Sequence, residues 1–104
     1  MTMFRVIIET TAVSDLRGIM RYITEILKEP VIAKRIYTSI REQIFTLDHF
    51  PLRQPLVNDE TFAMRGLRKM PVENYLVFYV ADEAKKEVRV LRVLYNRREW
   101  QSLL

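Results

Sequence analysis

The stretch from Arg65 to Trp100, RGLRKMPVENYLVFYVADEAKKEVRVLRVLYNRREW, decides the fold. It contains two β-prone runs, Tyr75–Ala81 and Val88–Tyr95, which are rich in Val, Leu, Tyr and Phe and are joined by the polar segment Asp82–Glu87. Both runs are apolar at odd and even positions alike. The sequence therefore predicts two strands with both faces covered, as in the middle of a sheet.

Upstream of this stretch, the sequence predicts one strand and two helices. The run Phe4–Glu9 is β-prone, and Ser14 and Asp15 then supply an N-cap signal for a first helix. Pro30 ends that helix and suits the start of a second one, which stops before Pro51. Apolar residues spaced by three and four mark both helices as amphipathic; they are Leu16, Ile19, Met20, Ile23, Ile26 and Leu27 in the first and Ala33, Ile36, Tyr37, Ile40, Ile44 and Leu47 in the second.

Together these elements predict an α+β fold. Two helices with so short a link form an antiparallel hairpin, and because neither can bury its stripe alone, both should pack on one face of the sheet. The segment 53–61 is expected to be a loop, residues 62–70 a second strand, residues 71–74 a tight turn and residues 98–104 a short helical turn. The predicted order is strand, helix, helix and three further strands, with a mainly antiparallel sheet. Residues 1–104 are expected to form one domain.

Composition narrows the class of protein. Of 104 residues, 49% are hydrophobic and 29% are charged, which is typical of a globular chain. The absence of cysteine and the presence of one histidine argue against disulfides, thiolate catalysis and structural zinc. His49, at the end of the second helix, is expected to bond the last carbonyls of that helix. Neither a signal-peptide pattern nor a membrane-length apolar run is present, so we expect a cytoplasmic protein with no membrane partner, metal or cofactor.

Charge is distributed unevenly along the chain. Residues 1–61 carry eight Lys/Arg and eight Asp/Glu, whereas residues 62–104 carry nine Lys/Arg and five Asp/Glu, which accounts for the whole net charge of +4. A basic half of this kind fits binding to nucleic acid or to an acidic protein. Arginine suits phosphate because its planar fork donates paired hydrogen bonds, and an aromatic ring can stack on a base. The candidate target-binding residues are Arg68, Lys69, Arg89, Arg92, Arg98 and Trp100.

A structural alternative explains the same arginines. In this interpretation Arg89, Arg92, Arg97 and Arg98 pair with Glu83, Glu87 and Glu99, or simply face solvent. Charge pattern by itself favours neither interpretation.

Several sequence motifs, by their order and spacing, resemble those of the RelE/ParE superfamily of bacterial toxins, which includes plasmid-stabilisation proteins. They are DLRGIMRYI in the first helix, IFTLDHFP at the end of the second, MRGLRKMPVENYLVFYV over the middle strands and VRVLRVLYNRREWQSLL at the end. The resemblance implies a toxin that arrests growth and is held inactive by a cognate antitoxin in a hetero-oligomeric complex.

The superfamily holds two activities: ParE-like members poison DNA gyrase, and RelE-like members cleave mRNA on the ribosome without a metal. Four positions of this chain match basic catalytic residues of RelE-like members. Two of them are still basic, Arg65 and Arg97, and the other two are the apolar residues Ala63 and Leu76. The C-terminal tyrosine has no counterpart, so Tyr95 would have to replace it. The resemblance thus gives Arg97, Arg65 and Tyr95 as catalytic candidates. Because the residues of such a catalytic set act together, the loss of several of them favours the gyrase inhibitor over the nuclease. A third hypothesis is an inactive member that binds only the antitoxin.

Overall fold

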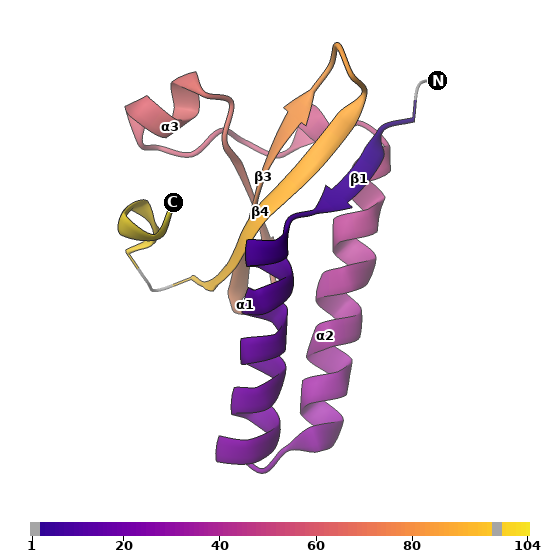
Figure 1. The fold of residues 1–104 in the computed structure, drawn as a ribbon, viewed down its shortest axis with the longest axis vertical. Coiled ribbons are helices and arrows are strands. Elements are labelled where there is room, and N and C mark those ends of the chain that lie inside the picture. The colour runs from indigo at the N-terminus through magenta and orange to yellow at the C-terminus, as the bar shows by residue number, and fades with distance from the viewer. Residues whose placement is uncertain (1–2, 97–98) are drawn as a thin grey trace.

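A four-stranded sheet forms the centre of the protein (Figure 1). The computed structural model describes residues 3–96 and 99–104. The strands lie in the order β1-β4-β3-β2, where β1 pairs with β4 in parallel and the other two pairs are antiparallel. This arrangement confirms the predicted α+β fold with a mainly antiparallel sheet. The strands are β1 Arg5–Ile8, β2 Arg68–Val72, β3 Tyr75–Asp82 and β4 Glu87–Tyr95.

Two long helices cover one face of this sheet, as the amphipathic stripes predict. Helix α1 runs over Thr10–Arg21 and continues as a π-helical turn at Tyr22–Ile26, and α2 runs over Pro30–Phe45. They form the expected antiparallel hairpin, which extends beyond the end of the sheet (Figure 1). The remaining helical segments are short: the 3₁₀ turns Thr46–Asp48, Pro51–Arg53 and Trp100–Leu103, and the helix α3 Glu60–Met64. Among the described residues, no helix is long and apolar enough to cross a membrane.

The prediction of a strand over residues 62–70 is wrong for the first part of that segment, which belongs to α3; only the part from Arg68 onward lies in a strand. The Asp59 side chain accepts a hydrogen bond from the Phe62 backbone N–H at 3.1 Å and so caps α3. Gly66, with φ of 82°, then turns the chain into β2, which begins only at Arg68. The predicted tight turn at 71–74 narrows to two residues, because Pro71 remains in β2, an edge strand where a missing N–H is tolerated.

The predicted N-cap of the first helix is also wrong. Helix α1 begins at Thr10, immediately after β1, so Ser14 and Asp15 lie inside it.

The expected role of His49 is filled by another side chain. The Arg53 guanidinium donates to the carbonyls of Thr46 at 3.3 Å and His49 at 2.7 Å, at the end of the second helix.

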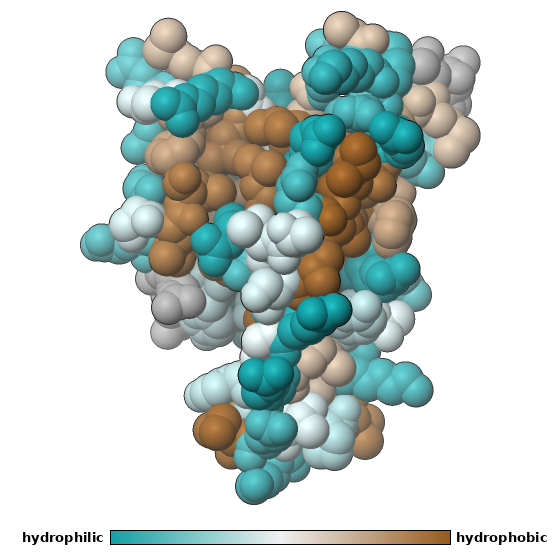
Figure 2. Space-filling model, viewed as in Figure 1, coloured by the Kyte–Doolittle hydropathy of each residue, from teal (hydrophilic) through white to brown (hydrophobic). Residues whose placement is uncertain are grey.

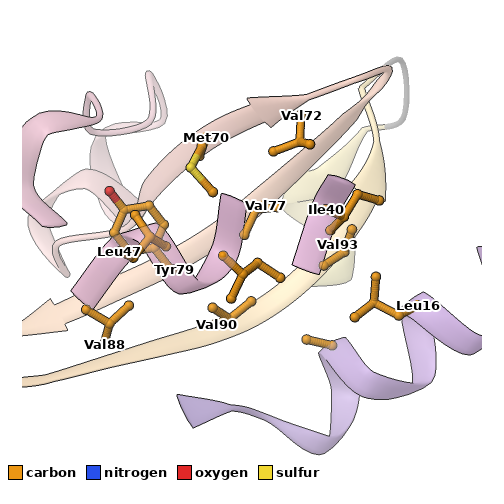
Figure 3. Close-up of a cluster of buried hydrophobic side chains, with 12 residues drawn as sticks. Leu16, Ile40, Leu47, Met70, Val72, Val77, Tyr79, Val88, Val90 and Val93 are labelled. Atoms are coloured by element: carbon orange, nitrogen blue, oxygen red, sulfur yellow. The ribbon is translucent and has the colours of Figure 1, made fainter. Parts of the chain in front are cut away.

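Apolar side chains fill both faces of the sheet, as the unbroken apolar runs in β3 and β4 predict. Between the sheet and the hairpin, Leu16 and Ile40 point toward Val77 and Val93 (Figure 3). A second, smaller core lies on the opposite face, under α3 and the C-terminal turn. Its members are Val57, Leu67, Phe78 and Leu94, with Phe62, Ala63, Leu76, Val80, Leu91, Trp100 and Leu103 packed against them.

Helix α1 replaces a neighbouring strand along the second half of β4. Strand β1 pairs with β4 only as far as Val90. Beyond that point the Thr11 hydroxyl donates to the Leu91 carbonyl at 2.7 Å. The Asp15 carboxylate accepts from the Val93 backbone N–H at 2.9 Å. Side chains of α1 therefore satisfy backbone groups that would otherwise lie on an open edge.

One buried hydroxyl ties β3 to the loop after α2, and its removal is expected to destabilise the fold. Tyr79 is fully buried and its hydroxyl donates to the Pro51 carbonyl. Burial raises the pKa of Tyr79, although nearby Arg68 opposes that rise. The substitution Tyr79→Phe leaves the Pro51 carbonyl without its donor, which should lower the free energy of unfolding by about 1–2 kcal/mol in a urea titration. Tyr37→Phe, whose exposed hydroxyl only accepts from Arg41 at 3.4 Å, is the control. Equal midpoints for the two variants would contradict this role.

Candidate functional site

Cations and aromatic rings meet on the face of the sheet opposite the helical hairpin. The Arg65 guanidinium lies 5.8 Å from the centroid of the Phe62 ring. The Trp100 ring centroid is 5.5 Å from that of Phe62 and 5.1 Å from that of Phe78. Lys69 pairs with Phe78 in the register of β2 and β3, so its side chain leaves the sheet on the same face. We call these five residues, Phe62, Arg65, Lys69, Phe78 and Trp100, the far-face patch.

The two cations of this patch have no carboxylate partner within the described residues. No Asp or Glu oxygen in 3–96 or 99–104 lies within 4.0 Å of the charged nitrogens of Arg65 or Lys69. Arg65 is exposed and Lys69 is half-buried. Figure 2 shows apolar side chains gathered over the sheet next to α3 and the C-terminal turn, with polar side chains around them. An apolar surface with unpaired cations suits an anionic macromolecular partner.

Local structure explains how these residues come together. The capped turn of α3 places Phe62 and Arg65 three residues apart, on neighbouring positions of one helix face. The C-terminal 3₁₀ turn brings Trp100 back onto Phe78, in the middle of β3. Sequence reasoning missed Phe62 because it assigned that residue to a strand. The Asp59-Glu60 pair, an N-cap followed by an acidic first turn, is the signal that would have indicated the helix.

Three other predicted cations are bound within the fold. Arg89 contacts Glu9 at 2.5 Å, and that hydrogen bond raises the pKa of Arg89. Arg92 donates to both carboxylate oxygens of Asp15, at 2.7 and 2.8 Å, which raises the pKa of Arg92. Arg68 donates to two backbone carbonyls, those of Leu52 at 3.3 Å and Gln54 at 2.7 Å. Arg89 also lies 3.5 Å from Glu87, the one predicted partner that the described contacts include.

Tyr95 lies far from Arg65, one of the two cations with which it was grouped. It pairs with Tyr75 at one end of the sheet, whereas Arg68 pairs with Tyr79, four residues further along β3, or roughly 13 Å away. Arg65 lies beyond Arg68, so the structure does not bring Tyr95 and Arg65 together. Trp100 belongs to the far-face patch and is half-buried there. Arg97 and Arg98 lie outside the described residues.

Among residues 3–96 and 99–104, no group of three or more His, Asp or Glu side chains is placed to hold a metal ion.

Three solved structures share the fold. The chain superposes on one from the chromosomal ParDE TA system from P. aeruginosa with a TM-score of 0.73 and 21% identity, covering 89% of this chain and 96% of that one. For the toxin-antitoxin complex RelBE2 from Mycobacterium tuberculosis the TM-score is 0.68 and the identity 24%, over 90% and 99% of the two chains. For the archaeal RelE-RelB complex from Pyrococcus horikoshii OT3 these values are 0.59 and 16%, over 93% and 99%. No curated protein matches the chain.

A helical hairpin packed on one face of a four-stranded mixed sheet is thus the fold that this chain shares with these structures. Residues 6–100 match the family model described as "ParE toxin of type II toxin-antitoxin system, parDE". The chain belongs to this ParE toxin family.

Proposed function

We propose that this toxin, acting in the cytoplasm as a single domain within residues 1–104, inhibits DNA gyrase by binding and is neutralised by a cognate antitoxin. The observation that carries the proposal is the separation of Tyr95 from Arg65. A nuclease needs its proton-transfer group and its phosphate-binding cations within hydrogen-bonding reach of one substrate. A binding inhibitor needs only a complementary surface, and the far-face patch provides one.

The antitoxin follows from the family and from the neighbours. A type II toxin is one component of a pair, and the neighbours include a toxin-antitoxin complex and a RelE-RelB complex. We propose that this chain also forms a hetero-oligomer with its antitoxin.

Arg65 and Lys69 are the side chains to which we assign direct contact with gyrase, with Trp100 supplying apolar area between them. Arg68, Arg89 and Arg92 already have partners within the fold. They contribute their positive charge to the surface potential of the same half of the chain. Arg97 and Arg98 precede Trp100 in the sequence and remain sequence predictions for this surface.

Charge reversal of the patch is expected to weaken gyrase inhibition. Each interfacial cation contributes about 1 kcal/mol to binding, so the double variant Arg65→Glu/Lys69→Glu should raise the inhibitory concentration by about 30-fold. The measurement is DNA supercoiling by purified gyrase over a range of toxin concentrations. Because both side chains are at the surface, thermal unfolding should change little.

The matched control changes charge to the same extent elsewhere. Lys28→Glu/Lys34→Glu reverses two exposed lysines at the distal end of the helical hairpin and should inhibit supercoiling like the wild type. Equal loss in both double variants would show that net charge matters and the patch does not. Full inhibition by Arg65→Glu/Lys69→Glu would remove the patch from the gyrase interface.

A ribosome-dependent mRNA endonuclease is the second candidate, and the observation in its favour is that Arg65 and Lys69 have no carboxylate partner among the described residues and could bind phosphate. Brief expression without antitoxin separates the two. Early DNA breakage that disappears in cells with a resistant gyrase supports the inhibitor. An early stop in protein synthesis with cuts in translated messages supports the nuclease. Unaffected growth would identify a member that retains only antitoxin binding.

A further inference from the structure

A hollow of about 600 Å³ lies at the end of the sheet where β3 turns into β4. Phe50, Leu52 and Arg53 line it from the loop after α2, and Glu83 and Lys86 line it from the turn between the two strands. Figure 1 shows this turn at the opposite end of the molecule from the tip of the helical hairpin. The five residues of the far-face patch, all of which the structure describes, are not among the lining residues. The hollow is therefore separate from the surface assigned to gyrase.

Phe50 is the most exposed apolar residue of this hollow. It is 66% exposed, and Leu52, two positions further on, is 42% exposed. Phe4 and Pro51 add two more apolar walls. A ring that is mostly exposed contributes little to the core, and large apolar side chains exposed beside an apolar recess mark an interaction surface.

The backbone of Phe50 has a conformation that suits other residues better. Its φ is 47° and its ψ is 55°, in the left-handed region that bulky residues rarely adopt. Pro51 follows directly, and a residue before proline favours extended backbone. The Phe50 carbonyl accepts from the Arg53 backbone N–H at 3.1 Å and from its guanidinium at 3.2 Å, which holds the turn in place. Glycine or asparagine would make the same turn with less strain, so the fold requires the turn but not the phenyl ring.

Two opposite charges line the hollow without pairing to each other. Glu83 and Lys86 are both exposed, and among residues 3–96 and 99–104 neither has an opposite charge within 4.0 Å. The Lys86 ammonium lies 5.0 Å from the centroid of the Phe4 ring. The Arg53 guanidinium, by contrast, already donates to backbone carbonyls of its own loop. An acidic and a basic side chain next to an exposed ring make this surface complementary to itself.

We propose that this hollow binds a second copy of the chain about a two-fold axis. In such a pair the same surface meets itself. The ring of Phe50 enters the hollow of the other copy, and Glu83 of each copy faces Lys86 of the other. Seven described residues line the hollow, against roughly 20–30 per side in a standard interface. The dimer should therefore be weak, with a dissociation constant of about 10–100 µM. The inference goes beyond the proposed function and holds whether or not gyrase is the target.

Sedimentation equilibrium of the purified toxin without antitoxin tests the proposal. At about 0.15 M salt, repulsion between two chains of net charge +4 is largely screened. The wild type should then reach half association at about 10–100 µM. A wild type that stays monomeric up to about 1 mM overturns the inference.

Exchange of charge between Glu83 and Lys86 identifies the surface. Glu83→Lys and Lys86→Glu each place like charges opposite one another, so each variant alone should associate at least about 10-fold more weakly. A mixture of the two variants, and the double variant Glu83→Lys/Lys86→Glu, should associate like the wild type, because opposite charges then meet again. Glu25→Lys, which changes net charge as Glu83→Lys does but at the tip of the hairpin, should associate like the wild type. A mixture that associates no better than either single variant overturns the inference.

Phe50→Asn removes the ring but keeps a residue that tolerates left-handed backbone. It should weaken association by about 10-fold or more, and its melting temperature should not fall, because the backbone strain is relieved. Phe45→Ala changes another exposed phenylalanine, which does not line the hollow, and should associate like the wild type. A lower melting temperature of Phe50→Asn with unchanged association would assign the ring to the fold and overturn its place in the interface.

Other occupants of the hollow give a different result. The antitoxin probe is the purified protein encoded by the gene next to the toxin gene, and the gyrase readout is DNA supercoiling. A monomeric wild type, together with a Phe50→Asn variant that binds the antitoxin or inhibits gyrase at least about 10-fold more weakly, assigns the hollow to that partner and overturns the inference of a second copy.

Discussion

Phe78→Ala is expected to lower the free energy of unfolding by about 3–5 kcal/mol. Phe78 is fully buried at the centre of the second core, on the face of the sheet that the long helices do not cover. The described segments over it, α3, the C-terminal turn and the loop that carries Val57, are short, so little structure can collapse into the space that the ring leaves. The measurement is a urea titration followed by circular dichroism.

The indole of Trp100, the only tryptophan, provides a local readout for this variant. Its ring centroid lies 5.1 Å from that of Phe78, so loss of Phe78 should expose the indole and shift its emission to longer wavelength in the folded state. Gyrase inhibition should weaken as well, because the far-face patch loses its central ring. Leu76→Ala, a half-buried neighbour on the same face, is the control and should cost about 1–2 kcal/mol. A loss no larger than that control, with unchanged emission, would show that the second core adds little to stability.

Asp15→Ala should destabilise the protein by about 2–4 kcal/mol. One carboxylate accepts three hydrogen bonds, two from the Arg92 guanidinium and one from the Val93 backbone N–H. Side-chain exposure is 13% for Asp15 and 22% for Arg92, so neither group is replaced freely by water. Removal of the carboxylate leaves the Val93 N–H without an acceptor and the largely covered Arg92 guanidinium without its counter-charge, although Arg92 still donates to the Leu103 carbonyl at 2.7 Å.

Two variants separate the charge from the hydrogen bond. Asp15→Asn keeps an acceptor for the Val93 N–H but removes the negative charge beside Arg92, so its stability should lie between those of the wild type and Asp15→Ala. Glu9→Gln removes the partner of Arg89, which is more exposed, and should have a smaller effect than either. If Asp15→Ala unfolds at the same urea concentration as Glu9→Gln, the contact between α1 and β4 does not stabilise the fold as argued.

The elements that the sequence predicted correctly are those whose signal is local and periodic. Apolar residues at spacings of three and four predicted α1 and α2, and unbroken apolar runs predicted β3 and β4 with both faces covered. The segment 62–70 misled because apolar residues there serve two elements, a short capped helix and the start of a strand. The N-cap role predicted for Asp15 was wrong for a chemical reason: a carboxylate near the start of a helix is as suitable for capping that helix as for binding a distant arginine.

Candidate residues were predicted less well than elements, because sequence spacing says little about ion pairing. Arg89 was expected to pair, if at all, with nearby acidic residues, and its partner at 2.5 Å is Glu9, 80 positions away. Arg92 similarly pairs with Asp15, 77 positions away. Parallel pairing of β1 with β4 brings the first fifteen residues beside the last strand, and no local pattern encodes that juxtaposition.

Sequence by itself determined the secondary-structure pattern, the basic second half and the resemblance to the RelE/ParE superfamily. Tertiary structure decided which cations are left for a partner: within residues 3–96 and 99–104, Arg65 and Lys69 have no carboxylate partner, while Arg68, Arg89 and Arg92 are bound. The tertiary structure also leaves the C-terminal end of β4 partly uncovered, because β1 is too short to pair with it there and α1 contacts only part of that edge. The physical reason is that hydrophobic periodicity acts between residues a few positions apart, whereas electrostatic and hydrogen-bond partners are set by distance in space.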